Sequence, residues 1–308
     1  MIPPDSRPPA EPDVREDAYP SLGRTAWLLA GTLLAVLVLA AAAVAMFPDW
    51  PQIVQMAVPT EIALAGAVVW AVHRSGLPWR RALGLHALSP AVLAPLALVL
   101  VGSVTVFSEM YVVVQRVVPI PPELEALQRD LLRISGPTDL VFTVALAVVL
   151  APLLEEALFR GVILHGLARR RGPGSAVLWT AGFFAFFHFY NPWQIVPTFF
   201  LGLLLGWVVL TTRSLWSSIV LHSAFNGLSL AVFGLPLQSA PDAPPAVVVT
   251  GVVIFLLLGS AALLGGLAWL ESMTGGGAFA DPPPAAPGSE GAGAPAASGA
   301  GRYPAARG

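Results

Sequence analysis

The chain contains no cysteine and no lysine, and charge of either sign is scarce: 11% of its 308 residues are charged. The missing cysteine excludes a thiol nucleophile, a disulfide framework and a Cys-ligated zinc site. A net charge of −2 gives no support for nucleic-acid binding. Soluble domains carry about 25% charged residues. Because 56% of this chain is hydrophobic and its mean hydropathy is +0.74, it is predicted to be a polytopic membrane protein.

The two ends of the chain differ in composition from the rest. Residues 1–24 are rich in proline and mixed in charge, which predicts disorder. They do not resemble a secretory signal, because the first apolar run, Thr25 to Phe47, has the length of a membrane span. Residues 273–308 are dominated by glycine, alanine and proline and are predicted to form a flexible tail.

The apolar runs predict an all-α transmembrane bundle. A spanning helix needs about 20 apolar residues. On that basis the sequence predicts about eight spans, at 25–47, 53–73, 92–115, 138–164, 175–190, 193–212, 215–234 and 246–270. Between the third and fourth, leucines recur at helical spacing over Pro121–Arg133, which predicts an amphipathic surface helix.

The placement of arginine indicates the orientation. With eight spans, the loops that hold most arginines fall on one side: Arg74, Arg80 and Arg81, then Arg169, Arg170 and Arg171, then Arg213. The positive-inside rule makes that side cytoplasmic. Arg129 and Arg133 lie on the other side, accompanied by acidic residues. The expectation is a multi-pass protein of the cell membrane with both termini in the cytoplasm.

Polar residues stand inside three of the predicted spans. Each charged side chain at the bilayer centre costs about 3 kcal/mol even on lenient insertion scales, so charges placed there are expected to have a use. With a rise of about 1.5 Å per residue, the polar groups of the three spans reach a similar depth. They are Glu155, Glu156 and Arg160 in the fourth span, His188 in the fifth, and His222 and Asn226 in the seventh.

Two carboxylates in the fourth span have different expected surroundings. Glu156 and Arg160 are four residues apart, the spacing of a helical ion pair, and pairing lowers the cost of burial. Glu155 points about 100° away around the helix and has no local partner. It is therefore a candidate general base or acid.

The two histidine spans supply the other groups that hydrolysis requires. His222 and Asn226 share a helix face, and both side chains can donate hydrogen bonds to an oxyanion. His188 is a candidate to orient a water with Glu155 or to ligate a metal. A base, a water-positioning group and oxyanion donors together favour hydrolysis.

Other polar residues of the spans have simpler interpretations. No histidine is followed by glutamate as in an HExxH zinc helix, and there is no GxSxG serine motif. Ser217, Ser218 and Ser223 are small residues that commonly assist helix packing. Glu61 and Glu109 each stand alone in a span and are assigned structural or interfacial roles.

Three motifs resemble those of one known family. EEALFRGVIL at 155–164 resembles the EExxxR motif of the CPBP family, which comprises CAAX proteases and bacteriocin-processing enzymes. Phe184 to His188 resembles its FxxxH motif and His222 to Asn226 its HxxxN motif. The resemblance covers about residues 138–232, with Thr180 where such proteins often have serine.

The resemblance implies an intramembrane endopeptidase that acts on a membrane-associated peptide or protein. In such an enzyme, Glu155 and His188 would activate the water, and His222 with Asn226 would hold the oxyanion. Glu156 and Arg160 would shape the site. Eukaryotic members cleave prenylated CaaX proteins, but nothing in this sequence shows such a substrate. Members are often called metalloproteases, although a metal-free glutamate mechanism has also been proposed. A zinc ion on Glu155, His188 and His222 therefore stays open.

Composition, the apolar runs and the resemblance together suggest how the chain is organised. Composition and apolar runs predict a disordered segment 1–24, accessory helices at 25–134, a final helix at 235–272 and a tail at 273–308. The resemblance implies a CAAX-protease-like core at 135–234. Two alternatives to an enzyme are a non-catalytic membrane partner, such as a bacteriocin-immunity protein, and an ion-coupled transporter. Against transport, there are no paired broken helices and no repeat symmetry.

Overall fold

The computed structural model describes residues 19–131, 134, 136–234 and 245–275. These described residues are almost entirely helical and include no strand, which confirms the all-α prediction. The predicted disorder of residues 1–18 and the predicted tail at 276–308 lie outside the described residues. The start of the fold falls earlier than predicted, because the first helix begins at Leu22 and Tyr19 is already buried.

Seven helical stretches of the described chain are long and apolar enough to cross a membrane. They are α1 (Leu22–Met46), α2 (Gln52–Ser75), η1 with α4 (Pro90–Val92 and Leu93–Val117), the segment Pro137–Arg171, η4 with α10 (Pro192–Gln194 and Ile195–Thr212), α11 (Leu215–Ser229) with η5 (Leu230–Gly234), and α12 (Pro245–Thr274). Two shorter helices, α3 (Trp79–Ala82) and α5 (Pro122–Leu131), lie in connections. The helix predicted between the third and fourth spans is thus present as α5.

The predicted fifth span is shorter than expected. It forms helix α9, Pro173–Phe187, with 15 residues. At about 1.5 Å per residue this helix cannot cross the roughly 30 Å hydrocarbon core. The chain leaves the helix at His188 and turns through residues 188–191, where the Asn191 N–H donates to the His188 carbonyl at 3.0 Å. The count of about eight spans is therefore seven full-length spans and one short helix.

The fourth span is a continuous helix with two π-helical segments. Its order is α6 (Pro137–Thr143), η2 (Val144–Leu150), α7 (Ala151–Glu156), η3 (Ala157–Ile163) and α8 (Leu164–Arg171). The π segments η2 and η3 flank the six residues of α7, which end in the two adjacent glutamates. π-helical turns are rare and frequently occur at functional sites.

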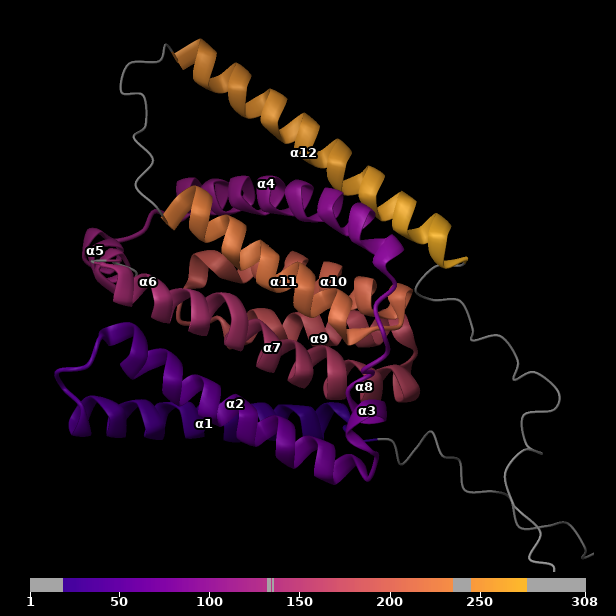
Figure 1. Cartoon of the computed structure of the whole chain (residues 1–308). Helices are drawn as coiled ribbons and strands as arrows, with labels where there is room; N and C mark the ends of the chain where they lie inside the picture. Colours follow the sequence, from indigo (N-terminus) through magenta and orange to yellow (C-terminus); the bar gives the residue numbers. More distant parts are fainter. Residues whose placement is uncertain (1–18, 132–133, 135, 235–244, 276–308) are drawn as a thin grey trace, which may run out of the picture.

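The helices form three groups (Figure 1). Helices α1 and α2 pack together on one side, and α4 and α12 pack on the other. The fourth span, α9, α10 and α11 lie between these pairs (Figure 1). The residues predicted to carry chemistry therefore stand on the central helices.

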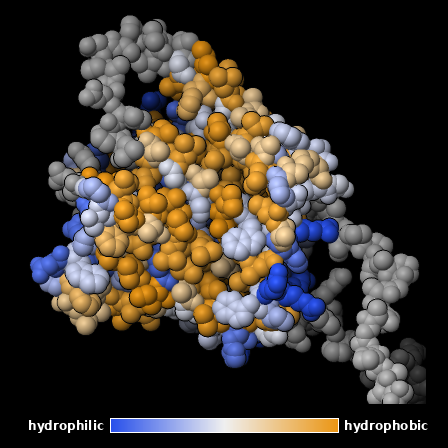
Figure 2. Space-filling view, in the orientation of Figure 1, coloured by the Kyte–Doolittle hydropathy of each residue, from blue (hydrophilic) through white to orange (hydrophobic). Residues whose placement is uncertain are grey.

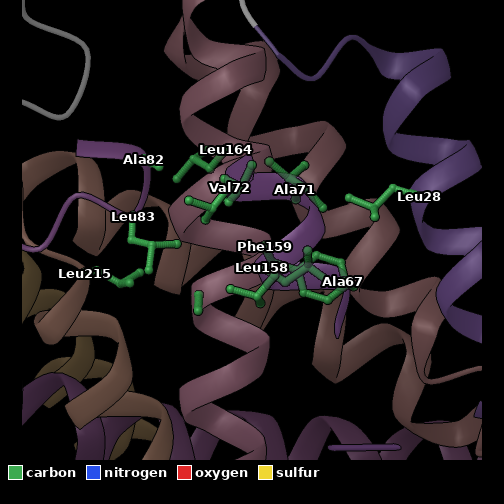
Figure 3. Packing of buried hydrophobic residues seen from close by; sticks show 14 of the residues in the cluster. Leu28, Ala67, Ala71, Val72, Ala82, Leu83, Leu158, Phe159, Leu164 and Leu215 are labelled. Carbon is green, nitrogen blue, oxygen red and sulfur yellow. The ribbon is translucent and has the colours of Figure 1, made fainter. Parts of the chain in front are cut away.

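Two apolar clusters hold the central helices in place. One fills the space between α1, α2, η3 and α8, and includes Leu28, Ala67, Leu158, Phe159 and Leu164 (Figure 3). The other joins α4, α10, α11 and α12 through Val99, Leu205, Val208, Leu221 and Leu270. The outer surface is also mostly apolar in Figure 2, as expected of a surface that faces lipid tails.

Helices α4 and α12 approach closely because glycines line their contact. A Cβ on Gly102 would lie 2.4 Å from the backbone nitrogen of Leu263, and one on Gly266 would lie 2.9 Å from the carbonyl oxygen of Pro95. Small residues are the usual basis of such packing, since in lipid no hydrophobic force drives helices together. The docking of α12 therefore depends on these glycines.

We predict that Gly266→Leu weakens the attachment of α12, at a cost of about 1–3 kcal/mol for forced overpacking. The matched control is Gly265→Leu at the neighbouring residue, where a Cβ would have nothing within 4 Å. Thermal unfolding of the two purified variants beside wild type measures the difference. Equal unfolding midpoints for both variants would contradict this account of the α4–α12 contact.

Candidate active site

A fully buried ion pair forms the base of the site. Glu156 ends α7, Arg160 lies in η3, and Arg160 Nη1 donates to Glu156 Oε1 at 2.7 Å. This confirms the pair predicted from their four-residue spacing. Arg160 Nη2 also donates to the Gly202 carbonyl of α10 at 3.3 Å. The arginine thus connects the fourth span to α10 as well as neutralising the carboxylate.

His222 of α11 shares the same carboxylate oxygen. Its Nδ1 lies 2.9 Å from Glu156 Oε1. A carboxylate oxygen accepts, so Nδ1 carries the hydrogen. The other ring nitrogen, Nε2, is 3.9 Å from Glu155 Oε2, which is too long for a direct hydrogen bond. The structure therefore brings Glu155, Glu156 and His222 together across two helices, with His222 between the two carboxylates.

The two adjacent glutamates differ in their surroundings. The Glu156 side chain is inaccessible, whereas that of Glu155 is 15% exposed. Within the described chain Glu155 has no hydrogen-bond partner, and its nearest recorded polar contact is the one to His222. Two carboxylates placed in such different environments are suited to different roles, one structural and one chemical.

His188 caps the C-terminal end of α9 next to this group. Its Nδ1 lies 2.9 Å from the Phe184 carbonyl oxygen of the preceding turn. A carbonyl only accepts, so Nδ1 holds the hydrogen and Nε2 presents a lone pair. No direct hydrogen bond joins His188 to Glu155 in the described residues. The contacts of His188 instead run through the rings of Phe184 and Tyr190, at centroid distances of 4.8 and 6.0 Å.

Phe184 links three of the predicted site residues. Its ring is 1% exposed, and the Arg160 guanidinium carbon lies 4.2 Å from its centroid, a cation–π contact. The His222 ring meets it edge-on at 5.8 Å, and the His188 ring lies on another side. In the sequence, its position four residues before His188, at the start of the FxxxH motif, was the available signal for these contacts.

Asn226 stands one turn beyond His222 on α11. Its Nδ2 donates to the Ala147 carbonyl of η2 at 2.9 Å. A primary amide has two N–H groups, so one hydrogen remains for another acceptor. The structure does not bond Asn226 to the glutamates or to His188 within the described residues. It ties α11 to the fourth span one turn away from the His222 contact.

Glu61, for which the sequence suggests a structural or interfacial role, stands on a helix that packs against α7. It lies on α2, is 6% exposed, and its Oε2 has no hydrogen-bond partner among the described residues. The negative charge of Glu155 acts on the Glu61 carboxyl group. No local pattern around Glu61 could have indicated this, because α2 precedes the three motifs by some 80 residues. Glu109, in contrast, lies on α4 and is not bonded to the described site residues.

The arrangement of the candidate metal ligands does not suit a three-ligand site. Among the described residues no group of three His, Asp or Glu side chains is placed to hold a metal ion. Glu155, His188 and His222 come from three elements, and because each histidine uses Nδ1 in a hydrogen bond, Nε2 is the ring nitrogen that a metal could bind.

One of three comparisons with known proteins gave a match, and it agrees with the sequence motifs. Residues 137–228 match the family model described as type II CAAX prenyl endopeptidase Rce1-like. The matched segment contains all three motifs and confirms the resemblance to the CPBP/CAAX proteases. Neither the curated proteins nor the solved structures gave a match. This segment is therefore similar to the type II CAAX prenyl endopeptidases, and the seven apolar helices of the described residues make the protein a multi-pass membrane protein.

We predict that Arg160→Ala lowers both stability and activity, because it leaves the Glu156 carboxylate buried without its ion-pair partner. Breaking a buried pair in this way costs about 3–5 kcal/mol. Arg171→Ala, at an exposed position in α8 of the same span, is the control. The unfolding midpoint of the purified variants measures the effect. An Arg160→Ala protein as stable as Arg171→Ala would show that the pair is dispensable.

We also predict that Phe184→Ala destabilises the site, whereas Phe186→Ala does not. Phe184 is 1% exposed and Phe186 is 65% exposed, although they are two residues apart. Loss of a buried phenylalanine costs about 3–5 kcal/mol. The comparison uses thermal unfolding of both variants. Similar losses from both would mean that the contacts of Phe184 with Arg160 and the histidines contribute little.

Proposed function

We propose that this protein is an intramembrane endopeptidase that hydrolyses a peptide bond of a membrane-associated protein or peptide. The observation that supports this most directly is the difference between the adjacent glutamates. Glu156 is inaccessible and held by Arg160 and His222, while Glu155 is partly exposed and without a hydrogen bond in the described chain. A partly accessible carboxylate 3.9 Å from a histidine ring nitrogen is suited to activate water.

In the proposed reaction Glu155 accepts a proton from a water molecule as its oxygen attacks the carbonyl carbon of the scissile bond. His188 orients this water. Its Nε2 has a lone pair to accept the second water hydrogen, because Nδ1–H is committed to the Phe184 carbonyl. The Glu155 carboxyl group then returns its proton to the leaving amine nitrogen as the C–N bond breaks.

The tetrahedral intermediate carries a negative oxygen that must be stabilised. We assign this to His222 Nε2 and to the second N–H of Asn226, whose first hydrogen goes to the Ala147 carbonyl. Because the Nδ1 hydrogen of His222 is used at Glu156, donation from Nε2 requires both ring nitrogens to be protonated. The Glu156 carboxylate is placed to balance the positive ring, and Arg160 keeps that carboxylate ionised and fixed.

The test is cleavage of membrane-tethered peptides by the purified protein in lipid. We predict that Glu155→Gln and His188→Ala lower the rate by about 10²–10⁴-fold, the usual contribution of acid–base catalysis. Glu155→Gln keeps the side-chain shape and removes a burial cost, so its unfolding midpoint should not fall. Glu109→Gln, which alters a glutamate of α4 not bonded to the described site residues, is the control and should cleave normally.

Three outcomes distinguish the alternatives. Full cleavage by Glu155→Gln would refute the assignment of the base. Loss of wild-type cleavage on adding a chelator would assign the water to a metal instead of to the side chains alone. If wild type cleaved no peptide of a broad panel, that result would favour a non-catalytic membrane partner that retains the family's motifs.

A further inference from the structure

Exposed arginines gather at one end of the helix bundle. In Figure 2 strongly hydrophilic side chains crowd the margin at which Figure 1 places α3 and α8. None of these exposed arginines forms an ion pair with a carboxylate of the described part of the chain. This arginine face consists of Arg24, Arg74, Arg80, Arg81, Arg169, Arg171 and Arg213.

Hydrogen bonds between the connecting segments bring several of these arginines together. The Leu215 N–H donates to the Gly84 carbonyl at 3.1 Å, and Ser214 Oγ donates to the His86 carbonyl at 2.7 Å. These bonds fasten the segment after α3 to the turn between α10 and α11. The His165 ring of α8 lies 2.9 Å from where a Cβ of Gly84 would be. The arginines of α3, of that turn and of α8 therefore share one surface.

The segment that begins at Tyr19 and leads into α1 borders the same surface. A Cβ on Gly166 of α8 would lie 2.4 Å from the Tyr19 carbonyl oxygen, so the segment before α1 rests directly on α8. The Tyr19 ring meets Trp70 of α2 edge-on at 6.1 Å. Burial raises the pKa of the Tyr19 hydroxyl, and the positive charges of Arg74 and Arg24 oppose that rise. Both arginines thus lie near Tyr19 and extend the face across α1 and α2.

Exposed tryptophans mark the depth of this face in the membrane. Tryptophan concentrates at the level where headgroups meet acyl chains. In α1, α2 and α11 a tryptophan stands three or four residues farther into the membrane than the nearest arginine, or about 5–6 Å along the helix. The exposed tryptophans at this end are Trp27, Trp70, Trp79, Trp179, Trp216 and Trp269. The arginines therefore lie at the level of the lipid phosphates.

We propose that the arginine face is a binding site for the phosphate groups of anionic lipid headgroups. Guanidinium groups bind phosphate through paired N–H donors, and these arginines have no carboxylate partner in the described chain. The one carboxylate that the described residues place at this end is Glu271, at the edge, near the end of α12. This inference concerns a surface remote from Glu155 and does not depend on the proposed peptidase activity.

The experiment titrates the purified full-length protein with phosphatidylglycerol and with phosphatidylcholine, and counts bound lipids by native mass spectrometry. We predict preferential binding of phosphatidylglycerol that weakens as salt is added. Each arginine near an anionic surface contributes about fivefold to affinity. Arg81→Gln should therefore weaken binding about fivefold, and Arg80→Gln with Arg81→Gln about 25-fold.

Two further variants make the result specific. Arg116→Gln removes one exposed arginine at the end of α4, on the opposite side of the bundle, and should leave affinity unchanged. Arg169→Gln with Arg171→Gln should weaken binding as much as Arg80→Gln with Arg81→Gln does. This second pair shows that the loss does not come from a local unfolding of α3. Unfolding midpoints show that each variant is folded.

Defined results would overturn the proposal. Equal affinity for the two lipids, or an Arg116→Gln loss equal to that of Arg81→Gln, would show that no headgroup site exists on this face. Displacement of phosphatidylglycerol by equimolar inorganic phosphate would assign the site to a soluble phosphate instead of a lipid. Selective loss in both arginine pairs, with no displacement by phosphate, supports the lipid site.

Discussion

The packing of the central helices depends on the hydrogen bonds that the Glu156 carboxylate accepts. One of its oxygens accepts from Arg160 at 2.7 Å and from His222 at 2.9 Å, in a region from which solvent is excluded. A buried carboxylate without such partners would be very costly. Because one partner lies on the same span and the other on α11, satisfying this charge also fixes how the two helices sit against each other. The arrangement of Glu155 and Asn226 follows from that contact.

The ion pair also explains why one phenylalanine contacts so many polar groups. Arg160 extends from the fourth span toward α10 and lies against the Phe184 ring. His188 follows Phe184 by one helical turn, and its ring contacts the same phenylalanine. The apolar and polar parts of the site are therefore not separate layers. The Phe184 ring contacts both the arginine of the ion pair and the His188 ring, and the Phe184 carbonyl accepts from His188.

The sequence predicted what depends on local spacing. The helices, the Glu156–Arg160 pair and the shared face of His222 and Asn226 all follow from residues a few positions apart. The bond between His222 and Glu156 joins residues 66 apart, and no periodicity reports which side of one span faces another. The packing of α2, which carries Glu61, against α7 is of the same kind. The length of α9 was overestimated because its apolar run continues into the turn at His188.

The two π-helical segments were also not predicted from the sequence, since neither the aliphatic run of η2 nor the mixed run of η3, which holds Phe159 and Arg160, marks a π turn. Each π turn accommodates one residue more than an α-helical turn of the same rise. Removing a single residue from η3 would therefore leave a regular α-helix, and the residues on either side would keep the faces they present. A deletion inside α7, which contains no extra residue of this kind, would rotate the rest of the helix by about 100°. The fourth span thus has two places where the chain can change length without changing which side chains meet, and the adjacent glutamates lie between them.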